Sequence, residues 1–249
     1  MNYLILAAGK SSRIYKNIKK PKSLLKVKKK TLISHIIDKI NQIRKNKTKI
    51  YIVTGFKQKL IKSKLYKKKN IKYIHNKDFD KKDMMSSLIL GLKNINDDTL
   101  MIYSDIYFDK KIITEIIKKK KKYITLPVLK NWKKIWKFRN KNIFEDAEDL
   151  KLNKKLFIKK IGSKIKNLKN SNYQYMGLVF FPKNKIRIII KIYNKLKDKN
   201  NLHVTRFLNI LIKNGYLIKA IPISAFWYEF DDYDDYKKFK RLAINNLSY

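Results

Sequence analysis

The sequence predicts an α/β fold, in which a mixed but mainly parallel sheet is covered by helices on both faces. Short apolar runs of strand length alternate with segments whose apolar residues recur at helical spacing. The runs are apolar at consecutive positions, as is typical of strands buried on both faces. No repeat, linker or low-complexity segment interrupts the 249 residues. We therefore expect residues 1–249 to form a single domain with a sizeable core.

The expected elements follow one another along the whole chain. Strands are predicted at 3–6, 50–54, 71–75, 100–104, 123–129, 173–181 and 217–223. Helices are predicted at 31–44, 58–66, 84–92, 109–119, 185–196, 204–213 and 233–242. The first five elements alternate strand, helix, strand, helix, strand, which implies parallel pairing with crossover helices.

The turn after the first strand is the most informative segment. The strand ends in Ala7, Ala8 and Gly9, whose small side chains let backbone N–H groups approach a charged ligand. Arg13 and Lys22 place two cations close behind this turn. A strand that ends in a small-residue turn followed by basic groups is suited to hold a nucleoside triphosphate.

Two common phosphate-binding motifs do not fit this turn. A P-loop requires a glycine where the chain has Leu4, so Gly9-Lys10-Ser11 is a chance match. A dinucleotide fingerprint requires three glycines, and only Gly9 is present. An ordinary strand and turn remains the structural alternative.

Composition limits the classes of function. The net charge is +43, from 62 basic and 19 acidic residues, and cysteine is absent. Lysine is spread along the chain and arginine is scarce, which favours a lysine-rich surface over a specific nucleic-acid site. No apolar run approaches the length of a membrane span, and no signal segment is visible, so we expect a cytoplasmic protein.

The opening segment resembles the signature of nucleotidyltransferases that join a nucleoside monophosphate to a phosphorylated sugar, alcohol or phosphonate. The matching residues are Leu-Ala-Ala-Gly-x-x-Ser-Arg, from Leu6 to Arg13, and Pro21-Lys22. The resemblance implies a Rossmann-like fold of the nucleotide-diphospho-sugar transferase type. It also implies nucleotide binding by Leu6, Ala7, Ala8 and Gly9, and catalytic roles for Arg13 and Lys22.

Carboxylates in two distant segments are candidate metal ligands. Asp105 follows a predicted strand, at the edge where ligands bind in open α/β sheets. Ser104-Asp105-x-x-Phe resembles the family's Gly-Asp-x-x-Phe, whose aspartate holds the catalytic Mg²⁺. Glu229 and Asp231 alternate on one face of a strand and resemble the element that completes this site.

Two serines are candidate nucleotide contacts. Ser87 resembles a family serine near the base or ribose, although a helix-capping role explains it equally well. Ser104 stands where the family usually has glycine, and Ser11 also replaces a frequent glycine. His203, by contrast, is predicted to be a capping or surface residue.

The middle of the chain combines aromatic and acidic residues. Trp132, Trp136 and Arg139 are followed by four acids within residues 145–149. Tryptophan faces and carboxylates together can hold an organic cation. Residue types alone favour equally a solvated acidic turn beside a small aromatic core.

This segment resembles cytidylyltransferases that activate aminoalkylphosphonates, to which phosphocholine cytidylyltransferases are related. The resemblance rests on Trp-x-x-x-Trp-x-x-Arg, Asp-Ala-Glu, Ile161-Gly162 and Tyr175-Met176-Gly177. It implies that residues 130–170 form a lid-like insert over the acceptor. The implied acceptor-binding residues are Trp132, Trp136, Arg139, Asp146, Glu148 and one or both of Lys160 and Lys164.

The resemblance implies a Mg²⁺-dependent cytidylyltransferase. It would transfer CMP from CTP to a small phosphonate or phosphate with a cationic amine, such as 2-aminoethylphosphonate or phosphocholine. The alternatives are a sugar-1-phosphate nucleotidyltransferase and a non-catalytic polyanion-binding protein of the same fold. No specific nucleic-acid or membrane partner is expected, and the sequence leaves open whether the chain forms a homodimer.

Overall fold

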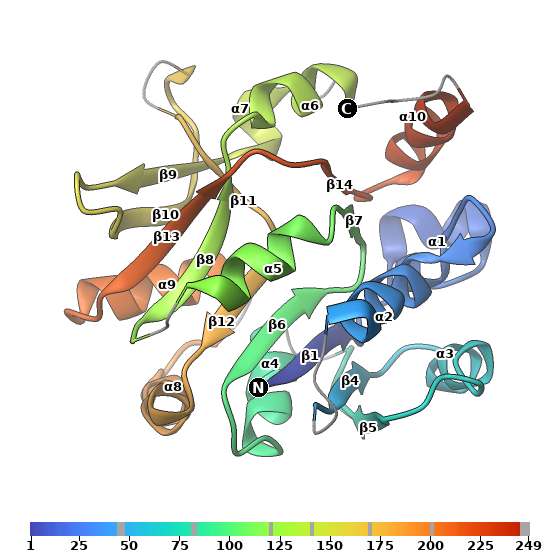
Figure 1. The fold of residues 1–249 in the computed structure, drawn as a ribbon, viewed down its shortest axis with the longest axis horizontal. Helices are drawn as coiled ribbons and strands as arrows, with labels where there is room; N and C mark the ends of the chain where they lie inside the picture. The colour runs from blue at the N-terminus through green and yellow to red at the C-terminus, as the bar shows by residue number, and fades with distance from the viewer. Residues whose placement is uncertain are drawn as a thin grey trace.

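The computed structural model describes residues 1–43, 48–80, 84–119, 122–139, 142–168, 171–199 and 202–244. These residues form an eight-stranded mixed sheet with helices packed against it (Figure 1). The strands of this sheet are β1 (Asn2–Ala7), β4 (Ile50–Thr54), β5 (Ile71–His75), β6 (Thr99–Tyr103), β8 (Ile124–Leu129), β11 (Gln174–Tyr175), β12 (Leu178–Phe181) and β13 (Ile218–Ile223). Three two-stranded ribbons accompany it: β2 (Lys26–Val27) with β3 (Lys30–Thr31), β7 (Ile106–Phe108) with β14 (Trp227–Glu229), and β9 (Glu148–Leu152) with β10 (Ile158–Lys164).

The parallel half of the sheet is built around β1. This strand pairs in parallel with β4 on one side and with β6 on the other, and β5 extends the sheet beyond β4. The other half is mixed, because β12 runs antiparallel between β6 and β8, whereas β13 is parallel to β8. The carboxyl ends of β1 and β6 therefore meet at one edge, where open α/β sheets bind ligands.

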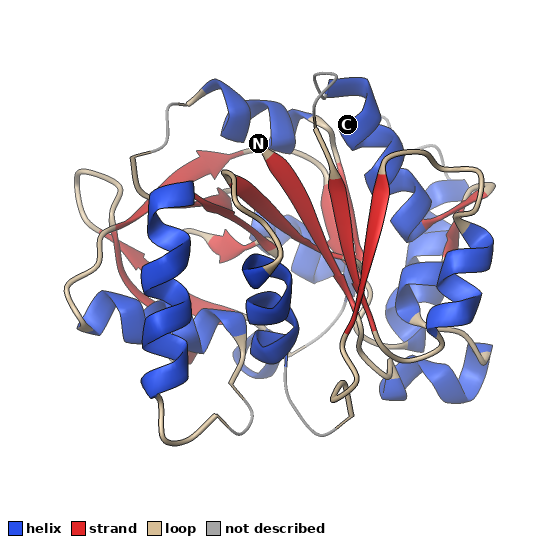
Figure 2. Ribbon diagram, turned by 90° about the horizontal axis from the view of Figure 1, so that it is seen from below, coloured by secondary structure: helices blue, strands red, loops and turns tan. Residues whose placement is uncertain are grey.

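Successive side chains of β1 point to opposite faces of the sheet, and each face has its own apolar core. Tyr3, Ile5 and Ala7 belong to one core, and Leu4 and Leu6 to the other. Figure 2 shows helices on both sides of the strands. The helices that contribute to the first core include α2 (Leu32–Ile43), α5 (Lys111–Lys118), α6 (Trp132–Arg139) and α10 (Tyr233–Ile244); α4 (Met84–Lys93), α8 (Lys183–Lys195) and α9 (Val204–Lys213) contribute to the second. None of the described helices is long and apolar enough to cross a membrane.

The fold class predicted from the sequence is confirmed, and most elements lie where the sequence places them. The strand predicted at 173–181 is divided into β11 and β12, because Gly177 between them has a positive φ of 74°. Helix α1 (Ser12–Ile18) is not predicted, since Ile14 is its one buried side chain. The β9–β10 ribbon is also missed, because charged residues interrupt its apolar alternation.

Residues 130–170 do not stand apart from the rest of the molecule. Their described part forms α6, the short helix α7 (Ile143–Asp146) and the β9–β10 ribbon. Strand β10 packs closely against α9, and Trp132 of α6 is fully buried in the first core. The segment therefore shares the core of the main sheet.

Candidate active site

A cavity of about 210 Å³ lies at the carboxyl ends of β1 and β6. It brings together predicted site residues from two segments that are distant in the chain, the opening segment up to Lys22 and the segment that contains Ser104 and Asp105. Its lining includes the predicted residues Leu6, Ala7, Gly9, Arg13, Lys22, Ser104 and Asp105, and it also includes Ser11, Ser12, Pro21, Ser23, Met84 and Tyr103.

The turn between β1 and α1 is held in place by a serine. Ser11 has φ 59° and ψ 33°, a left-handed conformation that glycine adopts most easily. Its hydroxyl Oγ accepts a hydrogen bond of 2.9 Å from the backbone N–H of Lys22. Ser11 thus fastens the turn to the residue that carries the second cation, which gives a reason for serine at this position.

The β7–β14 ribbon brings the two acidic segments together. Glu229 lies opposite Ile106 in this antiparallel pair, and the N–H of Phe230 donates to the carbonyl oxygen of Asp105 at 3.0 Å. Asp105 and Asp231 therefore lie at the same end of the ribbon. Their meeting, which the sequence could only infer by resemblance, follows here from the backbone register.

Both aspartates converge on Lys22. Its Nζ lies 3.3 Å from Asp105 Oδ2 and 3.5 Å from Asp231 Oδ1, while Arg13 Nη2 lies 3.3 Å from the same Oδ1. Burial disfavours the charged lysine, but attraction from Asp105 and then Asp231 outweighs burial and raises the pKa of Lys22. The ammonium group therefore stays protonated beside the cavity.

Glu229 occupies a different electrostatic position. Burial, followed by repulsion from Asp231 and Asp105, raises the pKa of Glu229 well above that of an ordinary glutamate. Three carboxylates that share one region would repel one another without added positive charge. This excess of acceptor oxygens is the chemistry that a hard divalent cation requires.

The donor set fits Mg²⁺, although it does not enclose an ion. Within the described residues, no group of three or more His, Cys, Asp or Glu side chains is close enough to hold a metal alone. Mg²⁺ usually takes one or two carboxylates, and phosphate oxygens and water complete its shell. Asp105 and Asp231, which share Lys22 as a partner, satisfy that requirement.

Two predicted nucleotide contacts lie outside the cavity lining. Ala8 is buried and its carbonyl accepts from the N–H of Phe56 at 3.0 Å. Ser87 is buried on α4, and its Oγ accepts from Asn76 Nδ2 at 2.9 Å. Asn76 is not among the residues predicted from the sequence, although it is a polar residue directly after the parallel strand β5, a position where ligands bind in open α/β sheets.

The rings of Trp132 and Trp136 are buried and do not form an open cage, and acceptor binding by these residues stays a prediction. Trp132 is fully buried and donates from Nε1 to the carbonyl of Ser171 at 3.2 Å. The ring of Trp136 stacks on Trp227, with centroids 5.8 Å apart and planes 6° from parallel. Both rings belong to the first core because α6 packs against it with this face. Residue type alone does not show which face of a helix is buried.

Arg139 and Asp146 are likewise bound to the chain itself. The guanidinium of Arg139 is 0% exposed, and its Nη1 lies 3.2 Å from Asp146 Oδ2. Its other nitrogens contact Asp231 and Asp235 at 2.9 and 3.1 Å. That Arg139 contacts the acceptor stays a prediction, and in this structure its partners are carboxylates of the chain itself.

Glu148 is the predicted acceptor residue with an uncommitted oxygen. Its Oε1 accepts from Thr205 Oγ1 at 2.8 Å, whereas Oε2 is buried without a hydrogen-bond partner among the described residues. Burial raises the pKa of Glu148. The rings of Tyr175 and Tyr103 meet edge to face at 5.8 Å, and Tyr103 lines the cavity. The side chain of Gln174, the residue before Tyr175, exchanges hydrogen bonds with the backbone of Glu148, which brings Glu148 close to this tyrosine pair.

The two candidate lysines of β10 differ in their surroundings. Lys160 Nζ lies 3.7 Å from Asp149 Oδ2. Lys164 is exposed and lies directly opposite Glu148 in the β9–β10 pairing. Side chains of directly opposed residues point to the same face of a ribbon. The register therefore places Lys164 beside Glu148, whereas Lys160 pairs with Asp149.

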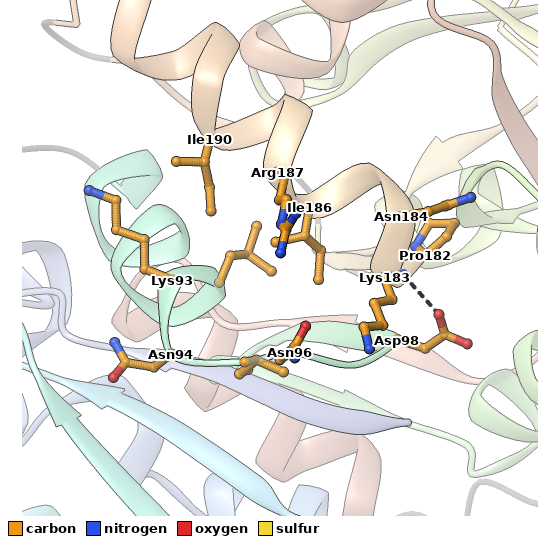
Figure 3. A pocket seen from close by; sticks show the side chains of 12 residues that line it. Lys93, Asn94, Asn96, Asp98, Pro182, Lys183, Asn184, Ile186, Arg187 and Ile190 are labelled. Carbon is orange, nitrogen blue, oxygen red and sulfur yellow. Dashed lines mark hydrogen bonds between the residues drawn. The ribbon is translucent and has the colours of Figure 1, made fainter.

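A second, larger hollow lies elsewhere, between the end of α4 and the start of α8 (Figure 3). Ile186 and Ile190 line it together with Lys93 and Arg187, and Asp98 accepts from the N–H of Lys183 at 2.8 Å. The segment before β6 contributes to this hollow, so it lies at the amino end of that parallel strand. Of the sequence-predicted site residues, none lines it.

Comparison with known proteins gives a family and a common fold. The MobA-like NTP transferase domain matches residues 3–160. The CTP:phosphoglutamine cytidylyltransferase of Campylobacter jejuni is 30% identical over 250 aligned residues, which cover 94% of this chain and 97% of that protein. The T. maritima inositol-1-phosphate CTP transferase superposes with a TM-score of 0.75 at 16% identity, covering 100% of this chain and 98% of the other. The Streptococcus pneumoniae CTP:phosphocholine cytidylyltransferase gives 0.73 at 18% identity, covering 97% and 98%.

Proposed function

The chain belongs to the MobA-like NTP transferase family and is a nucleotidyltransferase, and from this premise we propose that it transfers CMP from CTP to a small phosphorylated or phosphonate acceptor. The observation that carries the proposal is the convergence of Asp105 and Asp231 on Lys22 beside the opening turn. This arrangement places acidic metal ligands and a cation where a triphosphate would meet its acceptor. The Campylobacter jejuni relative supports CTP as the donor.

The reaction needs charge neutralisation and alignment rather than a protein nucleophile. An oxygen of the acceptor attacks the α-phosphorus of CTP in line, a new P–O bond forms, and pyrophosphate leaves. A phosphate or phosphonate oxygen is already ionised, so no general base is required. Lys22 and Arg13 stabilise the charge that develops on the transferred phosphate and on the leaving pyrophosphate.

A divalent cation fits this mechanism. Asp105 and Asp231 would hold Mg²⁺, and its positive charge would favour ionisation of the neighbouring Glu229, whose pKa is raised in its absence. The bound ion supplies charge neutralisation between the two anionic reactants. The side chains of this chain then orient the donor, and the fastened turn from Gly9 to Ser11 receives its phosphates.

The buried oxygen of Glu148 supports an acceptor that carries N–H groups. A carboxylate oxygen without a partner is costly in a buried site, and an ammonium or amide N–H would satisfy it. A quaternary ammonium has no N–H and is usually bound by open aromatic faces. Trp132 and Trp136 are buried, so we favour an aminoalkylphosphonate or an amino-acid-like phosphate over phosphocholine.

The test measures pyrophosphate release with CTP, UTP, ATP or GTP. Each triphosphate is combined with 2-aminoethylphosphonate, phosphoglutamine, phosphocholine or glucose 1-phosphate. We expect release with CTP and an N–H-bearing acceptor. Release only with glucose 1-phosphate would establish a sugar-1-phosphate nucleotidyltransferase. Silence in every combination, with salt-sensitive RNA binding, would instead support the polyanion-binding alternative.

The role of Glu148 is tested separately. Glu148→Gln should raise the apparent KM for the acceptor by about tenfold or more and leave that for CTP nearly unchanged, because one buried charge-assisted hydrogen bond is weakened. Glu115→Gln, on the surface helix α5, is the matched control. A change confined to the KM for CTP would refute the assignment of Glu148 to the acceptor.

A further inference from the structure

Arg139 is a fully buried cation surrounded by carboxylates from two distant segments. Its Nε lies 3.1 Å from Asp235 Oδ1, its Nη2 lies 2.9 Å from Asp231 Oδ2, and its Nη1 lies 3.2 Å from Asp146 Oδ2. The planar guanidinium is suited to such divided contacts, because its donors diverge in a fixed fork. Its face lies over the ring of Trp136, with 4.9 Å between the central carbon and the ring centroid.

The two carboxylate oxygens of Asp231 have different partners. Oδ2 receives the hydrogen bond from Arg139, while Oδ1 faces Lys22 and Arg13 beside the cavity. A carboxylate held by one oxygen cannot rotate freely, so the direction of its other oxygen is fixed. Groups behind metal ligands commonly fix ligand orientation in this way.

Asp235 completes the support behind Asp231. This buried carboxylate accepts from Arg139 and from the backbone N–H groups of Asp231 and Asp232, at 2.9 and 3.3 Å. It therefore fixes the backbone of Asp231 as well as the guanidinium that holds its side chain. The carbonyl of Arg139 in turn accepts from Lys238 Nζ, which ties the end of α6 to α10.

We propose that Arg139 is a positioning residue, which orients Asp231 for the metal–nucleotide complex and joins α6 and α7 to that carboxylate. The proposal rests on the proposed function, because it assigns Asp231 to the metal. Arg139 acts through Asp231 and does not touch the reactants. Asp146 is the last residue of α7, so its ion pair connects Arg139 to α7. Strand β9, which begins with Glu148, follows directly after α7.

Arg139→Lys tests the proposal, because lysine keeps the charge but cannot form the fork. We expect the concentration of Mg²⁺ for half-maximal activity to rise about 10–100-fold. The apparent KM for the acceptor should change little. Binding of Mn²⁺ together with CTP, measured by calorimetry without acceptor, should weaken by a similar factor. Lys137→Met, at an exposed position of the same helix, is the matched control, since it leaves all three carboxylate contacts of Arg139 in place.

Asp235→Asn provides a second variant in case Arg139→Lys does not fold. It should raise the Mg²⁺ requirement in the same direction, and the double variant should be no worse than the more severe single variant. Lower thermal stability with unchanged Mn²⁺–CTP binding in either folded variant would overturn the proposal. The proposed function fails separately. If the wild-type chain binds Mn²⁺ and CTP, if Arg139→Lys weakens that binding, and if CMP is transferred to no acceptor, only the activity is refuted.

Discussion

Lys22 is the residue at which the opening turn and the two acidic segments meet. Lys22→Met and Asp105→Asn should each lower the turnover number by about 10²–10³, because removing one group that stabilises developing charge has effects of that size. Both variants should remain folded, since each keeps a similar side-chain volume. Pyrophosphate release checks the prediction, with Lys16→Met on the exposed face of α1 as control. Near-normal turnover in either variant would remove the proposed centre.

A substitution at Gly177 tests whether the Tyr103–Tyr175 pair, which lies near both the cavity and Glu148, affects acceptor binding. It has φ 74°, and an added Cβ would lie 2.9 Å from Tyr103 Cδ2. Gly177→Ala should therefore displace the Tyr103 ring and raise the apparent KM for the acceptor, besides losing about 1 kcal/mol of stability.

Gly215→Ala is the matched control for this substitution. Gly215 has a similar φ of 82°, but an added Cβ meets no atom within 4 Å. We expect a comparable loss of stability in urea unfolding and no change in kinetics. Equal kinetic effects of the two variants would show that backbone strain, rather than Tyr103, is responsible.

Some site residues could be predicted from the sequence, whereas the burial of others could not. Arg13, Lys22 and Asp105 could be chosen because a motif fixes their spacing from a strand end. Arg139 and Trp136 matched the acceptor pattern equally well, yet both face inward. Residue type does not tell whether a charge meets solvent, a ligand or another side chain. For Arg139 the partners follow from the packing of α6 against α10, which brings Asp235 within ion-pairing distance.

At the scale of elements, continuous apolar runs such as β1 and β4 were predictable, because both faces of these strands are buried. The β9–β10 ribbon was not predictable, since its register shifts and its charged positions hide the alternation. The β7–β14 ribbon has three residues in each strand, too few to give a periodic signal. Nonetheless, this short ribbon decides where Asp105 and Asp231 meet.

Helix α2 contains a lysine that costs stability at neutral pH. Burial is the main reason that the pKa of Lys39 falls to about 8, although its Nζ lies 4.5 Å from the centre of the Tyr107 ring. In the unfolded chain the amine titrates near pH 10.5. The folded chain therefore binds the proton less well, and the penalty is complete below pH 8 and is relieved as the pH rises toward 10.5.

Lys39→Met should thus stabilise the fold at pH 6.5 by about 1 kcal/mol, after allowance for solvent screening. The gain should shrink as the pH is raised from 8 toward 10.5. Urea unfolding at pH 6.5 and 10 measures both values. Lys191→Met, on an exposed position of α8, should show no such pH-dependent gain. A gain that is constant across this range would contradict the account of Lys39.

Over the whole molecule, the mainly parallel sheet was predictable, whereas the antiparallel insertion of β12 and the distribution of charge were not predicted. Alternating strands and helices restrict a parallel sheet to a small number of arrangements. The net charge of +43 is spread over the surface, yet four of the 19 acidic residues gather around two cations. Asp105, Asp146, Asp231 and Asp235 all lie within ion-pairing distance of Arg139 or Lys22. The chain therefore concentrates negative charge at one site within a strongly basic surface.

This charge distribution predicts how the molecule responds to salt. Like charges destabilise a compact state, and the Debye length falls from about 10 Å at 0.1 M salt to about 3 Å at 1 M. Raising NaCl from 0.05 to 0.5 M should therefore increase the melting temperature, because the repulsion among surface lysines is screened more than the ion pairs of buried Arg139 are weakened. The same change should raise the apparent KM for the anionic donor. Calorimetry and pyrophosphate release measure the two effects, and a melting temperature that falls with salt would show that exposed ion pairs, rather than repulsion, dominate the electrostatics.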